Sequence, residues 1–140
     1  MKYSKLFMLL FFLMGSISFS QEVIKNFDEI LYKAITRGNS VVLKITSENV
    51  FYKDRKQERN EKITNANREK LIDLINEIVL SKMGQYKVLS NESASDRAMQ
   101  AELIIKVNGE EYKSSIFDDG NPPEELKEII ETMMRLGKPE

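Results

Sequence analysis

Alternating apolar and polar positions in the first half of the chain predict a meander of three β-strands. In the range 29–37, a two-residue period begins at Ile30 and Tyr32, and the same period recurs over 41–46 and 50–55. Polar turn residues separate the three ranges. Successive side chains of a strand point to opposite faces, so this period indicates strands with one buried face.

A 3.6-residue period then predicts a helix. The charged range 56–62 is interpreted as a loop before it. Thr64 is the expected N-cap, because its hydroxyl can accept a hydrogen bond from a free amide of the first turn, and Gly84 is the expected end. The apolar residues span about 160° of the helix surface, the width of a face that packs on a core. They are Leu71, Leu74, Ile75, Ile78 and Val79.

The clearest local signal is the dipeptide Asn108-Gly109. It accommodates the two positive φ angles of a type I′ turn, whose twist matches that of paired strands. A two-residue loop at this point predicts a hairpin in which Lys106 lies opposite Glu111. The flanking ranges that alternate are 101–107 and 112–117, and the preceding range 85–99 is interpreted as a long loop.

The residues after this hairpin predict a structural junction that leads into a second helix. Asn121 is the expected N-cap, Pro122 is expected at the first helical position, and Glu124 is expected at N3 of a capping box. Gly137 is the expected end of the helix. The other residues assigned to the junction are Asp118 and Gly120.

The element order βββαββα predicts an α+β fold. Each amphipathic helix needs an apolar surface to cover, and the strands provide one. The simplest arrangement is a single antiparallel β-sheet of about five strands, with two helices packed on one face. We expect this single α+β domain over 29–140, after an N-terminal leader over 21–28.

The first twenty residues have the layout of a secretory signal peptide. Two lysines precede an apolar run of nine residues over 6–14, and the small residues Ser18 and Ser20 follow it. A membrane-spanning helix needs about 20 apolar residues, so we expect cleavage after Ser20 rather than a retained anchor. The predicted location is the periplasm or the cell exterior of a Gram-negative bacterium, with no transmembrane segment after cleavage.

The residue inventory excludes several classes of chemistry. The 140 residues include no Cys and no His. Disulfide scaffolds, Cys/His zinc sites and Ser-His or Cys-His catalysis are therefore excluded, and we expect no metal and no cofactor. The formal net charge of -1 also argues against a nucleic-acid-binding protein, which is commonly strongly basic.

Charge is segregated between the predicted sheet and the predicted helices. The helices carry many acids, whereas one face of the sheet carries seven bases against Glu29, Glu102 and Glu111. Lysine is also common on solvated strands and sheet edges, which is the plainer interpretation. The functional interpretation is a basic sheet face that binds an anionic envelope partner. Its candidate residues are Lys33, Arg37, Lys44, Lys53, Arg55, Lys106 and Lys113.

These observations favour an exported, non-enzymatic binding or accessory protein. One alternative is a small hydrolase that works through carboxylates such as Asp118 and Glu102, which would have to flank a cleft. Another is an inhibitor or immunity-type protein that binds a protein target.

Two segments carry a resemblance to a group of small exported Bacteroidetes (flavobacterial) proteins. One is the strand Tyr-Lys-Ala-x-Thr-Arg-Gly at 32–38, and the other combines Asp96-x-Ala98-x-x-Ala101-x-Leu103 with Phe-Asp-x-Gly-Asn-Pro-Pro at 117–123. The chain resembles this group over about residues 30 to 136. The resemblance implies export from a Gram-negative cell and the order βββαββα. It carries over no catalytic residue, and Asp119 stands where many of those proteins have His.

Overall fold

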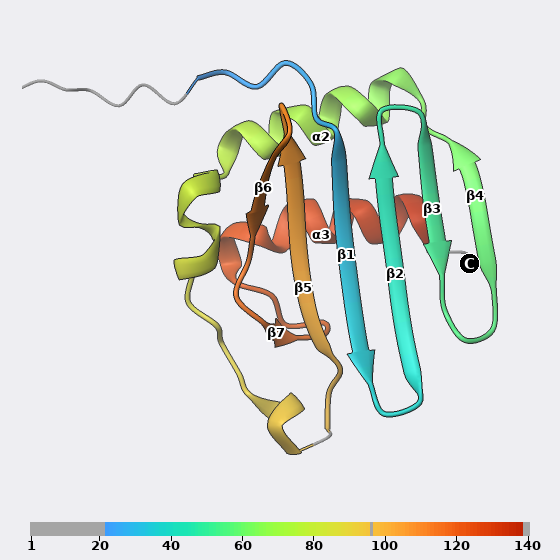
Figure 1. The fold of residues 1–140 in the computed structure, drawn as a ribbon, viewed down its shortest axis with the longest axis vertical. Coiled ribbons are helices and arrows are strands. Elements are labelled where there is room, and N and C mark those ends of the chain that lie inside the picture. Colours follow the sequence, from blue (N-terminus) through green and yellow to red (C-terminus); the bar gives the residue numbers. More distant parts are fainter. Residues whose placement is uncertain (1–21, 96, 139–140) are drawn as a thin grey trace, which may run out of the picture.

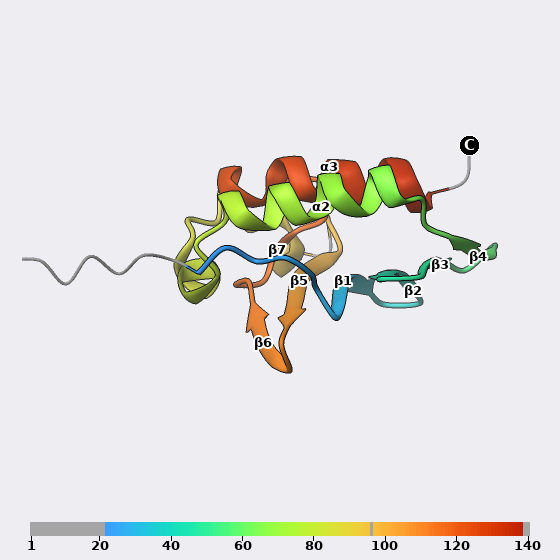
Figure 2. The same cartoon turned by 90° about the horizontal axis from the view of Figure 1, so that it is seen from above.

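Two helices cover one face of a single antiparallel sheet, as the computed structural model of residues 22–95 and 97–138 shows (Figures 1 and 2). The predicted α+β class is therefore confirmed. The signal peptide predicted over 1–20 and its cleavage site before Gln21 lie outside the described residues.

The strands form the spatial order β4-β3-β2-β1-β5-β6, and β7 pairs with the start of β5. All of these pairings are antiparallel. The strands are β1 (Glu29–Thr36), β2 (Asn39–Thr46), β3 (Asn49–Lys53), β4 (Glu58–Lys62), β5 (Gln100–Val107), β6 (Glu110–Lys113) and β7 (Phe117–Asp118).

The sheet has more strands than the five or so that the sequence predicts. Strand β4 occupies the range interpreted as a charged loop, and β7 is a separate two-residue strand beyond the hairpin. Strand β4 lies at the sheet edge and none of its residues is buried, so its sequence has no apolar alternation that could reveal it.

The hairpin register is confirmed. Lys106 pairs with Glu111 across β5 and β6, and their side chains form an ion pair at 3.4 Å. The loop residues Asn108 and Gly109 have φ angles of 52° and 77°, as the type I′ turn requires. Strand β6 ends at Lys113, before the end of the alternating range 112–117, although the Ser114 amide still donates to the Leu103 carbonyl at 2.9 Å.

Helix α2 (Asn65–Glu77) begins as predicted and ends early. The Thr64 hydroxyl accepts a hydrogen bond from the Asn67 amide at 3.3 Å, which confirms the N-cap. The chain leaves the helix at Ile78, well before Gly84. A short 3₁₀ helix, η1 (Leu80–Gln85), follows, and the Tyr86 hydroxyl bonds to both the amide and the carbonyl of Val79 between the two helices.

Helix α3 (Glu124–Gly137) ends as predicted, but its start differs. Pro123 is the N-cap and has no side-chain hydrogen bond, so Glu124 is the first helical residue rather than N3. Pro122 lies before the helix because a residue that precedes proline is disfavoured in the helical region. Asn121 does not cap the helix, and its side-chain amide instead donates to the Ser90 hydroxyl at 2.8 Å.

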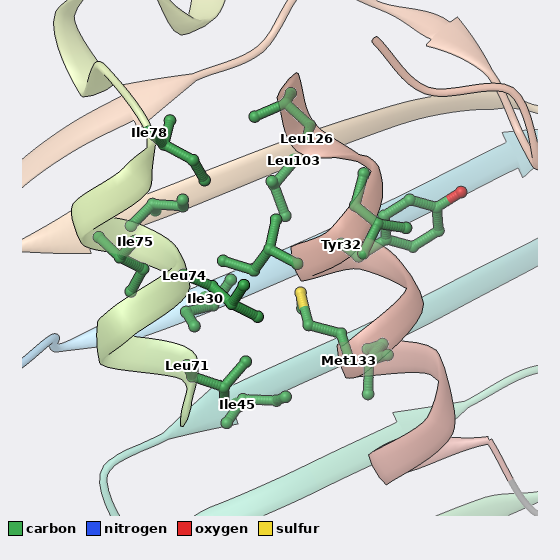
Figure 3. Packing of buried hydrophobic residues seen from close by; sticks show 14 of the residues in the cluster. Ile30, Tyr32, Ile45, Leu71, Leu74, Ile75, Ile78, Leu103, Leu126 and Met133 are labelled. Carbon is green, nitrogen blue, oxygen red and sulfur yellow. The ribbon is translucent and has the colours of Figure 1, made fainter. Parts of the chain in front are cut away.

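The core lies between the two helices and the sheet, where apolar side chains from both layers meet (Figure 3). It includes a residue from the range predicted as a leader, because Phe27 is only 1% exposed. The backbone of Ile24 in the same range exchanges hydrogen bonds with the Asn76 side chain of α2. Residues 24 and 27 therefore belong to the folded domain.

Candidate functional site

The uncovered face of the sheet carries five of the seven predicted binding residues, and four of these five are ion-paired. Lys33 pairs with Glu102 at 3.6 Å, and Lys53 pairs with Glu58 at 2.7 Å. The other two lysines bind to acids as well: Lys106 contacts Glu29 and Glu111, and Lys113 contacts Glu111. On this face, glutamates therefore offset most of the lysine charges, so the surface is not uniformly basic.

Lys44 is the fifth base on this face. It forms no ion pair within the described ranges, and its ammonium lies 5.8 Å from the centre of the Phe51 ring. On the same face, strand β4 adds Glu58 opposite Lys53, an acid in the range that was expected to be a loop.

The remaining two predicted residues, Arg37 and Arg55, lie elsewhere. They follow the ends of β1 and β3, in turns at the same end of the sheet (Figure 1). Both line a hollow of about 500 Å³ between these turns and the last turn of α3, which we call the end hollow. It is lined by Arg37, Gly38, Asn39, Val41, Tyr52, Asp54, Arg55, Lys56, Met99, Asp119, Met134 and Lys138.

The two carboxylates of the end hollow are already engaged. Asp54 accepts hydrogen bonds from the Lys56 amide at 2.7 Å, the Gln57 amide at 2.9 Å and the Tyr52 hydroxyl at 2.9 Å. The bond from the Lys56 amide is the main reason that the pKa of Asp54 is lowered. Asp119 accepts from the hydroxyl of Tyr32.

The two tyrosines stay protonated and serve as donors. Burial, and then the hydrogen bond to Asp54, raise the pKa of Tyr52 to about 12. Burial and the bond to Asp119 raise the pKa of Tyr32 far above its usual range. Each phenol donates to one carboxylate of the hollow, Tyr52 from the lining itself and Tyr32 from the core, so part of the acceptor capacity of both acids is already used.

The four bases of the end hollow are Arg37, Arg55, Lys56 and Lys138. All four side chains are exposed, and none forms an ion pair with another described residue. The end hollow thus combines available cations with carboxylates that tyrosine and amide donors occupy, which is a suitable arrangement for an anion. Sequence reasoning selected both arginines but placed them on the sheet face, and it did not select Lys56 or Lys138.

At the predicted structural junction, the Asp118 carboxylate binds the loop over 90–93 through hydrogen bonds, and we call this set of hydrogen bonds the clasp. Asp118 is 2% exposed and accepts from the Ser90 hydroxyl, the Glu92 amide at 2.7 Å and the Ser93 amide at 2.9 Å. These residues lead into or belong to the 3₁₀ helix η2 (Glu92–Ser95), within the range interpreted as a loop. Gly120 follows with a φ of 84°, a conformation that favours glycine.

We expect the clasp to weaken in acid. The hydrogen bonds from Ser90 first, and then from the Ser93 and Glu92 amides, hold the pKa of Asp118 well below its usual range. A lowered pKa contributes stability above the unfolded value of about 3.9, and this contribution is lost as the pH falls toward the folded value. Thermal melts of wild type and Asp118→Asn at about pH 7 and about pH 3 test this.

Wild type should be the more stable protein near neutral pH, and its advantage in melting temperature should shrink in acid. An equal difference at both pH values would contradict the assignment of the clasp to an ionised Asp118.

Two further observations bear on the chemistry of the molecule. No group of three Asp or Glu residues within 22–95 and 97–138 is placed to hold a metal ion. In the same ranges, no helix has the length and apolar character needed to cross a membrane.

Comparison of the chain with family models, with curated proteins and with solved structures gave no match. The resemblance to exported Bacteroidetes proteins therefore remains a prediction.

Proposed function

We propose that the protein is an exported, non-enzymatic binding protein that captures an anionic partner of the cell envelope in its end hollow. The observation that carries this proposal is the set of four bases without an ion pair, among the described residues, around one hollow in a chain whose formal net charge is -1. Export is supported by the signal-peptide pattern over 1–20.

The chemistry of the lining residues favours a carboxylate, phosphate or sulfate group. Arg37 and Arg55 each offer a planar guanidinium that can donate two parallel hydrogen bonds to such a group. The volume of about 500 Å³ is within the range of small-ligand sites, so it suits one anionic unit of a ligand or polymer. Val41, Met99 and Met134 add apolar contacts for the carbon skeleton that carries the charge.

The hydrolase alternative receives less support from the geometry. Asp118 accepts hydrogen bonds from three donors, and Glu102 is ion-paired with Lys33. A general acid needs a carboxyl with a raised pKa, whereas that of Asp118 is lowered. These two residues therefore fit a structural role better than an acid and nucleophile pair.

Retention on an immobilised polyanion such as heparin tests the proposal. Wild type should be retained at low salt and released as salt rises, because salt screens exposed charges. The double variant Arg37→Glu/Arg55→Glu should lose this retention. The control variant Lys44→Glu/Lys53→Glu changes the net charge by the same amount, but on the open sheet face. It should keep most of the retention on heparin.

Comparison of the two double variants shows which surface binds the anion, the end hollow or the open sheet face. Equal losses in both double variants would show that total charge, not the end hollow, controls retention. Loss in the sheet variant alone would assign binding to the originally predicted sheet face, and no retention of wild type at low salt would overturn anion capture. Circular dichroism melts of each variant establish that the proteins compared are folded.

A further inference from the structure

Strand β4 leaves one edge of the sheet unpaired within the part of the chain that the structure describes. It is the terminal strand of the order β4-β3-β2-β1-β5-β6, and four of its five residues are exposed. Figure 1 shows β4 at the margin of the molecule, with no described strand or helix beyond it. Unpaired edges can accept a further strand from another chain, because their outward amides and carbonyls have no partners.

The register of β3 and β4 identifies which residues of β4 have outward backbone groups. Hydrogen bonds join Ile63 to Glu48 just beyond one end of the ladder, and Asp54 to Gln57 just beyond the other. In an antiparallel ladder, hydrogen-bonded pairs alternate with non-bonded pairs, so Arg59 and Glu61 bond to β3. The amides and carbonyls of the other residues face the free edge; these are Glu58, Asn60 and Lys62.

The sequence of β4, Glu-Arg-Asn-Glu-Lys, is complementary in charge to its own reverse. In an antiparallel pair of two β4 strands centred on Asn60, Glu58 lies opposite Lys62 and Arg59 lies opposite Glu61. Asn60 lies opposite its own copy, and the residues with outward backbone groups face one another. Opposite charges across a strand pair are stabilising, and like charges are destabilising.

The neighbouring registers lack this complementarity. A shift of two residues in one direction places Arg59 opposite Arg59, and a shift in the other direction places Glu61 opposite Glu61. Only the register centred on Asn60 combines outward hydrogen-bonding groups with opposite charges at every charged pair.

We infer that β4 pairs with β4 of a second copy of this chain, about a twofold axis at Asn60, and extends the sheet across the dimer. A five-residue strand provides a small contact, so the dimer is concentration-dependent and weakens with salt. The end hollow is formed by other residues, so the dimer does not depend on the proposed function.

A charge-complementation experiment tests this inference. Glu58→Lys places a new lysine opposite Lys62 of the second copy, and Lys62→Glu places a new glutamate opposite Glu58. Each variant should therefore be monomeric by sedimentation velocity where wild type dimerises. An equimolar mixture of the two variants should dimerise again, because every charged cross-strand pair is then of opposite charge.

A backbone variant gives a second readout. Asn60→Pro removes an outward amide donor and leaves the hydrogen bonds to β3 intact, so this variant should also be monomeric.

Wild type that stays monomeric up to millimolar concentration would overturn the inference. A mixture that remains monomeric while wild type dimerises would assign the dimer to another surface. Melting curves of each variant distinguish a lost contact from a lost fold, and the complementation arm stays informative because both chains are measured alone and together.

Discussion

Replacing Phe27 by Ala should lower the free energy of unfolding by about 3–5 kcal/mol, the usual cost of removing a large buried aromatic side chain. Phe27 is 1% exposed and belongs to the core cluster, although the sequence pattern assigned its segment to a leader. Truncation removes this side chain from the core and leaves a cavity where it packed. Chemical denaturation of wild type and Phe27→Ala measures the loss.

Val23 provides the matched control, since it lies in the same segment and is 71% exposed. Val23→Ala should change stability by less than about 0.5 kcal/mol, as surface substitutions usually do. If Phe27→Ala were as mild as Val23→Ala, the segment before β1 would be the N-terminal leader that the sequence suggested, and Phe27 would not contribute to the core.

Leu126→Ala should cost about 2–4 kcal/mol of unfolding free energy. Leu126 is 0% exposed at the start of α3, where this helix packs over the sheet beside α2 (Figures 2 and 3). Removal of its branched side chain leaves a cavity beneath the helix, which the surrounding structure can close only in part. Urea titration followed by circular dichroism measures the effect.

The neighbouring Lys127 is exposed, so Lys127→Ala controls for the change of helix sequence without a change of packing. Near-equal effects of the two substitutions would mean that α3 does not pack through the face assigned to it.

The strands and helices that contribute to the core could be predicted from the sequence, because their buried residues recur with the period of a strand or a helix. Ile30, Tyr32 and Leu103 alternate with residues on the uncovered face, and the apolar stripe of α3 follows the helical period. Thr64 and Asn108-Gly109 were predictable for a different reason, since each satisfies a local backbone requirement that few residue types meet.

The elements that the sequence did not predict have no such periodic pattern of apolar residues. Strand β4 has no buried residue and therefore no alternation. The isolated Phe27 gives no period either, because one buried side chain in an extended segment cannot establish one. At the junction, Asn121 has the residue type of an N-cap, but Pro122-Pro123 delays the helix and Asn121 bonds to Ser90 instead.

The candidate site was predicted in part. Strand alternation placed Lys33, Lys44 and Lys53 on one face correctly, but it could not show that Glu58 would join them from β4. Arg37 and Arg55 follow the ends of their strands, where alternation no longer determines direction. The end hollow depends on the meeting of two turns with the last turn of α3, which is a tertiary arrangement without a local signal.

An amide NMR titration shows directly whether an anion binds in the end hollow. Titration of the ¹⁵N-labelled protein with inorganic phosphate, and then with a heparin-derived oligosaccharide, reports which backbone amides sense the ligand. The largest shifts should fall on Gly38, Arg55 and Lys56 and should disappear in Arg37→Glu/Arg55→Glu. Shifts centred on Lys44 and Phe51 of the open sheet face, or no saturable shifts with either ligand, would rule out anion binding in the end hollow.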